Sequence, residues 1–172
     1  MKKLIPSVLI ACALSLPAWA AEVTTKISGV HLCCKNCVVG VEKAVGEVPG
    51  VTTSVDKDAG TVSLTGPDTA TVQKGANALV AAGYFGKSSE TSIKVAADTG
   101  AKGKQVKSLT VKGVHLCCAK CANAVTEALK PVAGVTGNTA EKGATSFVVT
   151  GDFNDKEVFA ALQKAGLSGK AK

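Results

Sequence analysis

Alternating apolar residues predict a β-strand near the start of each half of the chain. Val23, Thr25 and Ile27 alternate with polar residues, and Leu109 and Val111 repeat this spacing in the second half. After each strand, apolar residues recur at intervals of three and four, which indicates an amphipathic helix. This stripe consists of Val41, Ala44, Val45 and Val48 in the first half and of Val125, Ala128, Leu129 and Val132 in the second.

The later elements follow in the same order in both halves. Gly50-Val51 and Gly134-Val135 end the helix and start a second strand, and turns at 58–60 and 142–143 lead into a third. A second helix is expected over 69–82 and over 155–165, and a short last strand over 84–88 and from residue 167. The order strand, helix, strand, strand, helix, strand is that of the ferredoxin-like fold. The sequence therefore predicts an α+β protein with two ferredoxin-like βαββαβ sandwiches in tandem.

A nine-residue motif occurs once in each half. Residues 29–37 read Gly-Val-His-Leu-Cys-Cys-Lys-Asn-Cys, and residues 113–121 read Gly-Val-His-Leu-Cys-Cys-Ala-Lys-Cys, so that seven of nine positions are identical. In the ten positions after the motif only two are identical. A repeat at a fixed offset indicates duplicated domains, and these domains share one loop far more closely than the helix that follows it.

The first 20 residues are typical of an export signal. Met1-Lys2-Lys3 is followed by an apolar stretch and by Ala18-Trp19-Ala20, a small-residue cleavage site. The stretch is shorter than the roughly 20 apolar residues that cross a bilayer, so we expect no transmembrane segment in the mature chain and a periplasmic location. Attachment of lipid at Cys12 is the competing interpretation. The expected domains are 21–95 and 106–172, joined by a Gly-containing linker over 96–105.

The charge pattern argues against nucleic-acid binding. The formal net charge is +7, but every basic residue is Lys and aromatic residues make up only 3% of the chain. Nucleic-acid readers use Arg for bidentate contacts and aromatic side chains for base stacking. The Lys excess, which lies in the second half, is interpreted as solvated surface that could aid docking on an acidic partner.

The cysteines of the motif are the candidate metal ligands. Cys34 and Cys37, like Cys118 and Cys121, are three residues apart at an expected strand-to-helix junction. A helix start lowers the pKa of a thiol and favours the thiolate, and thiolates select soft ions such as Cu(I) and Zn(II). These four cysteines are the predicted primary ligands.

Cys33, Cys117, His31 and His115 are candidates for additional ligands. Adjacent residues normally point apart, so Cys33 is expected to lie away from Cys34 and Cys37 unless the loop bends. Cys33 or His31 could then supply a third ligand. A His-Cys₃ set would suit tetrahedral zinc, whereas two or three thiolates would suit Cu(I).

The cysteines also fit three functions besides metal carriage. Structural disulfides are common in exported proteins, but each trio spans five residues, so a bridge would close a tiny loop and stabilise little. A thiol–disulfide exchange protein would use the Cys-x-x-Cys pairs for redox chemistry. A sensor or interaction module would hold one ion shared between its two domains. Hydrolytic catalysis is disfavoured because the motif contains no acid to serve as a base, and no enzyme activity is expected.

At these residues the chain resembles the heavy-metal-associated domain family, which includes copper chaperones, metal-transporting ATPases and exported mercury-binding proteins. The family pattern Gly-Met-x-Cys-x-x-Cys, with a later Gly-Val, matches residues 34–37 with 50–51 and residues 118–121 with 134–135. Ala82-Gly83-Tyr84 resembles the Ala-Gly-Tyr before the last strand of bacterial members, where the Tyr approaches the metal loop. The Met is missing here, the Gly lies further from the Cys pair, and Cys33, Cys117, His31 and His115 are additions.

This resemblance implies a carrier that passes its ion to a partner by thiolate exchange. The expected partners are the metal ion itself and a membrane metal transporter or another metal-carrier protein. We therefore predict a non-enzymatic periplasmic carrier or buffer for a thiophilic ion, with Cu(I) favoured over Zn(II) and Zn(II) over Hg(II).

Overall fold

The computed structural model describes residues 22–172, and the expected export signal and Cys12 lie outside this range. The first half contains β1 (Val23–Ser28), α1 (Lys35–Gly46), β2 (Thr52–Asp56), β3 (Thr61–Gly66), α2 (Thr69–Ala81) and β4 (Lys87–Ser88). The second contains β5 (Gln105–Lys112), α3 (Ala119–Leu129), β6 (Val135–Asn138), β7 (Ser146–Asn154), α4 (Asp155–Lys164) and β8 (Lys170–Ala171). Both halves thus have the predicted order of elements.

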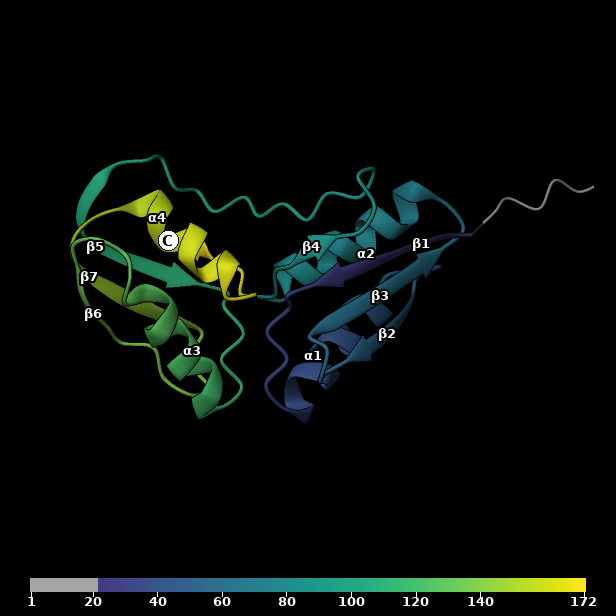
Figure 1. Cartoon of the computed structure of the whole chain (residues 1–172), viewed down its shortest axis with the longest axis horizontal. Helices are drawn as coiled ribbons and strands as arrows, with labels where there is room; N and C mark the ends of the chain where they lie inside the picture. The colour runs from purple at the N-terminus through teal and green to yellow at the C-terminus, as the bar shows by residue number, and fades with distance from the viewer. Residues whose placement is uncertain (1–21) are drawn as a thin grey trace, which may run out of the picture.

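Each half forms one antiparallel four-stranded sheet with two helices packed on it. The strand orders are β2-β3-β1-β4 and β6-β7-β5-β8, so the first strand of each half is central. Ile27 pairs with Val62 in the first sheet, and Val111 pairs with Phe147 in the second. Figure 1 shows the two halves side by side, with the segment between β4 and β5 running across from one to the other. The predicted α+β class with tandem ferredoxin-like sandwiches is confirmed.

The apolar stripes of the helices form the core of each half, as their spacing predicts. Val41 and Val45 of α1 are fully buried, and Val125 and Leu129 occupy the matching places in α3. Leu79 and Leu162 bring α2 and α4 onto the same cores. Burial of these side chains, at roughly 25 cal/mol for each Å² of apolar surface, is the main source of stability for such small sandwiches.

The segment that joins the halves is tied to the start of α4. The Asp155 carboxylate accepts hydrogen bonds from the backbone N–H groups of Lys102 (2.9 Å), Gly103 (2.7 Å) and Lys104 (2.9 Å). Asp155 N–H in turn donates to the Lys104 carbonyl at 3.0 Å. This anchored end leads directly into β5, which begins at Gln105.

Within residues 22–172, no helix combines the length and the apolar character that a bilayer crossing requires.

Candidate metal centre

The two repeated loops lie where the first strand of each half gives way to a helix. Cys34 is the N-cap of α1 and Cys118 is the N-cap of α3, so that both cysteines stand at helix N-termini. Cys37 and Cys121 follow in the first turn and are fully buried. Leu32 and Leu116 are 6% and 4% exposed and anchor each loop in the core below it. This anchoring explains why the motif contains a Leu beside its cysteines.

The segments after α2 and α4 join the two halves through their backbones. Tyr84 and Leu167 form an antiparallel bridge. Phe85 N–H donates to the Gly166 carbonyl at 3.0 Å, and Ser168 N–H donates to the Gly83 carbonyl at 2.9 Å. These contacts repeat around an approximate twofold axis. The cysteine-containing loop of one half therefore lies against that of the other.

Gly83 and Gly166 permit this close approach. Their φ angles are +93° and +79°. A Cβ on Gly83 would lie 2.4 Å from the backbone nitrogen of His115, and a Cβ on Gly166 would lie 2.3 Å from the carbonyl oxygen of Gly29. Any other residue at either position would push against the backbone of the opposite loop.

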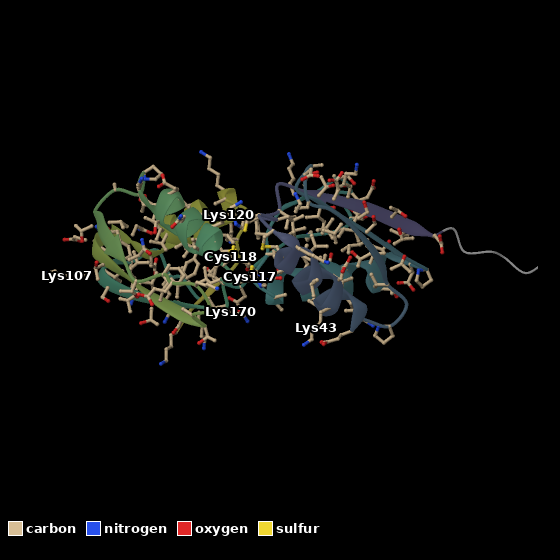
Figure 2. All side chains as sticks on the ribbon, turned by 90° about the horizontal axis from the view of Figure 1, so that it is seen from below. Lys43, Lys107, Cys117, Cys118, Lys120 and Lys170 are labelled. Atoms are coloured by element: carbon tan, nitrogen blue, oxygen red, sulfur yellow. The ribbon has the colours of Figure 1, made fainter. Side chains whose placement is uncertain are left out.

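The six cysteines of the two motifs form a single cluster between the halves. Figure 2 shows Cys117 and Cys118 at this junction, where sulfur atoms from both sides gather. Across the junction, the Cys33 sulfur lies 3.5 Å from that of Cys118 and 3.4 Å from that of Cys121. The Cys117 sulfur lies 3.6 Å from those of both Cys34 and Cys37. All six cysteines are free thiols.

The third cysteine of each motif takes part in the cluster because the loop bends. The Cys33 sulfur lies 3.7 Å from that of Cys37, and the Cys117 sulfur lies 3.7 Å from that of Cys121. Cys33 was expected to lie apart from Cys34 and Cys37 unless the loop bends. The loop does bend, and Cys33 lies beside Cys37.

The residues that could hold one ion are drawn from both halves. Four sets place three ligand atoms within 4.8 Å of one another: His31/Cys33/Cys121, Cys33/Cys34/Cys118, Cys34/Cys37/Cys117 and Cys117/Cys118/Cys121. Three of these four sets mix the two loops. The third ligand beside Cys34 and Cys37 is thus Cys117 of the other half in this arrangement, where the sequence suggested Cys33 or His31.

Each histidine faces the opposite half. The Nε2 atoms of His31 and His115 are buried and have no hydrogen-bond partner. His115 stacks on Tyr84 with ring centroids 4.7 Å apart and contributes to lowering the pKa of the Cys37 thiol. Burial lowers the pKa of His31, which keeps its imidazole neutral. Because buried polar atoms normally have a partner, these two ring nitrogens are candidates to bind a metal ion or to hydrogen-bond its ligands.

Tyr84 fixes the position of the buried cysteine in the first half. Its hydroxyl donates to the Cys37 carbonyl at 2.9 Å, and burial raises the pKa of Tyr84, so the phenol stays protonated. The family resemblance predicted that Tyr84 approaches this loop, and it predicted no other residue of the surroundings. The stacking of His115 on Tyr84 joins the two halves, and no pattern in the sequence signals it.

The thiols of the cluster cannot all ionise without a cation. A hydrogen bond from Cys121 lowers the pKa of Cys37, and the Cys37 thiolate in turn raises the pKa of Cys121. Burial raises the pKa of Cys33 to about 12. Like charges within about 4 to 6 Å of one another disfavour the charged form. A bound metal ion would remove this repulsion, and its binding would release protons.

A groove of about 320 Å³ opens beside the cluster on the side of the second half. Its lining includes Ala82, His115, Cys117 and Gly143. The groove gives the cluster an opening to solvent next to a candidate ligand.

Comparisons with known proteins add little to this geometry. No family model matches the chain, and no curated protein matches it. Among solved structures, the N-terminal soluble domains of Bacillus subtilis CopA are 19% identical, with 89% of this chain and 95% of that chain covered and a TM-score of 0.33. The first two RRM domains of the yeast poly(U) binding protein (Pub1) are 11% identical, with 87% and 98% covered and a TM-score of 0.28. At such scores neither likeness bears on function.

Proposed function

We propose that this chain binds a thiophilic metal ion in a site shared by its two halves and acts as a non-enzymatic carrier or buffer. The supporting observation is the approach of cysteine sulfurs from the two loops to within 3.4 to 3.9 Å of one another. Free thiols from segments 80 or more residues apart meet here without forming a disulfide. Thiolates gathered in this way select soft ions.

The geometry favours Cu(I) over Zn(II), with Hg(II) third. The candidate sets each supply three ligand atoms. Structural zinc requires four ligands in a tetrahedron, whereas Cu(I) accepts three thiolates. The sulfur spacing supports thiolate coordination of either ion, because two thiolates bound to one ion at about 2.3 Å lie roughly 3.8 Å apart in a tetrahedral site. The preference for Cu(I) therefore rests on the number of ligand atoms in each set.

A variant that lacks the cysteines of one loop tests whether the site is shared. In the full chain, replacing Cys33, Cys34 and Cys37 by Ser should leave well under half of the tightly bound copper in protein purified under reducing conditions, because three of the four ligand sets need these cysteines. Two independent sites would leave half of it. The reciprocal triple variant in Cys117, Cys118 and Cys121 is the matched control, and elemental analysis is the measurement. Equal metal in wild type and in a variant lacking all six thiols would contradict metal binding altogether.

The proposed location is the periplasm, because residues 1–20 have the pattern of an export signal. A carrier there would exchange its ion with a membrane metal transporter or with another carrier. N-terminal sequencing of protein from a periplasmic fraction should find Ala21 as the first residue. An intact Met1 in the cytoplasmic fraction would contradict export.

Thiol–disulfide exchange is the second candidate, favoured by one observation. Burial acts to raise the pKa of Cys118, but hydrogen bonds from the Cys121 backbone and the Cys33 thiol outweigh it and lower this pKa to about 7. A thiol with such a pKa is a good attacking group near neutral pH. Robust turnover in an insulin-reduction assay, with metal excluded, would favour this function over metal carriage.

A further inference from the structure

The six sulfur atoms form an octahedral cage, in which each atom neighbours every other except one. Nine of the twelve neighbouring pairs lie 3.4 to 3.9 Å apart, both within one loop and across the junction. Three further pairs lie within 4.8 Å of each other in the ligand sets. Among the thiols of the described chain, three pairs make no thiol–thiol hydrogen bond and share none of these ligand sets: Cys33 with Cys117, Cys34 with Cys121, and Cys37 with Cys118. Three opposite pairs define the corners of an octahedron.

Alternate faces of this cage form triangles that meet only at their corners. One such set of four consists of Cys33/Cys34/Cys118, Cys34/Cys37/Cys117, Cys117/Cys118/Cys121 and Cys33/Cys37/Cys121. Every sulfur atom belongs to two of these triangles. The other four faces form a second set of the same kind, and the approximate twofold relation of the halves exchanges the two sets.

Two of these four triangles have the size of a three-coordinate metal site, and the sides of the other two lie within 4.8 Å. The sides of the Cys34/Cys37/Cys117 triangle are 3.8, 3.6 and 3.6 Å. An ion at the centre of such a triangle would lie about 2.1 Å from each sulfur, close to the roughly 2.3 Å of a zinc–thiolate bond. The Cys33/Cys37/Cys121 triangle, with sides of 3.7, 3.4 and 3.9 Å, has nearly the same size.

We propose that the six thiols hold a cluster of four Cu(I) ions, one at each of four alternate faces, with every thiolate bridging two ions. This inference rests on the proposed metal-binding function and specifies how many ions the shared site takes. Four Cu(I) ions replace the six thiol protons, which pass to solvent, and no electrons are transferred. The loaded cage carries a formal charge of roughly −2, the sum of four cations and six thiolates.

The surroundings of the cage favour this negative charge. Helices α1 and α3 both begin at it, with Cys34 and Cys118 as their N-caps. The positive ends of two helix dipoles therefore point at the cluster. Lys35 and Lys120 lie in the first turns of these helices and are exposed, which adds positive charge at the same place.

In this arrangement sulfur atoms supply every ligand. His31 and His115 would then donate hydrogen bonds to bridging thiolates and would not be ligands. Their buried Nε2 atoms, which have no other partner, are available for this purpose.

Titration of the reduced full-length mature chain with Cu(I) under anaerobic native mass spectrometry tests the proposal. We expect the chain to saturate at four ions, with the four-copper form accumulating at the expense of forms with one to three. X-ray absorption at the copper edge should show three sulfur neighbours for each copper and a short copper–copper distance.

Two double variants separate the cluster from a pair of independent Cys-x-x-Cys sites. Replacing the opposite pair Cys33 and Cys117 by Ser interrupts every face of the cage, yet leaves Cys34/Cys37 and Cys118/Cys121 intact. We expect this variant to bind two ions or fewer and to lose the copper–copper signal. Replacing Cys34 and Cys118, the matched control, leaves one intact face in each set but destroys both Cys-x-x-Cys pairs.

The possible outcomes separate the cluster from metal binding itself. Saturation of wild type at any number other than four, or equal copper content in wild type and the Cys33/Cys117 variant, would overturn the cluster while leaving metal binding in place. Absence of bound copper from reduced wild type would overturn the proposed function. Circular dichroism of each variant establishes that its fold is unchanged.

Discussion

At the scale of single residues, the cluster depends on side chains packed behind it as well as on its cysteines. Gly40 in α1 lies beneath Tyr84 and His115 and is the place where the two side chains meet the helix. A Cβ at Gly40 would lie 2.5 Å from the Tyr84 hydroxyl oxygen and 2.9 Å from His115 Cε1. Since Tyr84 is fully buried and bonded to the Cys37 carbonyl, it has little room to move.

We expect Gly40→Ala to displace His115 and to weaken Cu(I) binding about tenfold. This is the lower end of the loss of metal affinity that follows when a residue that hydrogen-bonds a metal ligand is removed. Overpacking should also cost about 1 to 3 kcal/mol of unfolding free energy. Gly46→Ala in the same helix is the control, because a Cβ there meets nothing within 4 Å. Chelator competition and urea unfolding measure the two effects, and equal behaviour of both variants would contradict the packing explanation.

Asp155 is a second residue whose environment makes a measurable prediction. Burial acts to raise its pKa, but the N–H donors of Lys102, Lys104 and Gly103 outweigh this and hold the pKa below the ordinary value. We expect Asp155→Asn to cost about 1 to 2 kcal/mol at neutral pH, since hydrogen bonds to a charged group are weakened.

The pH dependence of this difference follows from the lowered pKa. A carboxylate with a lowered folded-state pKa stabilises the fold above its unfolded pKa of about 3.9 and loses that contribution as the pH falls through the folded-state value. The gap between wild type and Asp155→Asn should therefore close in acid. Asp152→Asn, which removes an exposed carboxylate nearby, controls for net charge. A gap that is constant from neutral pH into acid would rule this explanation out.

At the scale of elements, the junction between the two halves is made by the short segments after α2 and α4. Their backbones pair through Tyr84 and Leu167, and a glycine precedes each of these residues. The halves can approach only because Gly83 and Gly166 leave space for the opposite loop.

Gly166→Ala should therefore open the junction and lower the number of copper ions bound. Gly143→Ala is a closely matched control, because both glycines have φ of +79° but a Cβ on Gly143 meets nothing within 4 Å. Both variants bear the strain of a left-handed residue, roughly 1 to 2 kcal/mol. Only Gly166→Ala should increase the radius of gyration in small-angle scattering. An unchanged radius and an unchanged copper content would show that the glycine is not needed for docking.

At the scale of the whole molecule, the buried apolar side chains of the two sandwiches form one connected cluster. If the halves also share one metal site, as proposed, metal binding should make them unfold together. Cu(I) that binds only the docked, folded form stabilises it by about 2.7 kcal/mol at a free concentration one hundred times the Kd. In calorimetry we expect the loaded chain to unfold in a single transition at a higher temperature than the metal-free chain. The variant without the six thiols should show no shift, and halves that respond separately to copper would contradict a shared site.

The sequence by itself determined the elements, the class of fold and the loops that carry the chemistry. Helical spacing located α1 and α3, and the repeated motif marked all six cysteines that the structure brings together. These features are local, since each depends on residues within one turn or one strand. A Cys-x-x-Cys site does not need the third cysteine of each motif. That extra cysteine was the one feature of the sequence that pointed to a site formed by both loops.

Only the tertiary structure decided that the two trios form one cage. The distance between Cys33 and Cys121 depends on how the two halves dock, and no periodicity along the chain encodes that. Docking is set by a few backbone contacts at Gly83, Tyr84, Gly166 and Leu167, which in the sequence look like ordinary helix ends. The motif thus identifies the six cysteines, whereas their arrangement in one cluster exists only because the two halves meet.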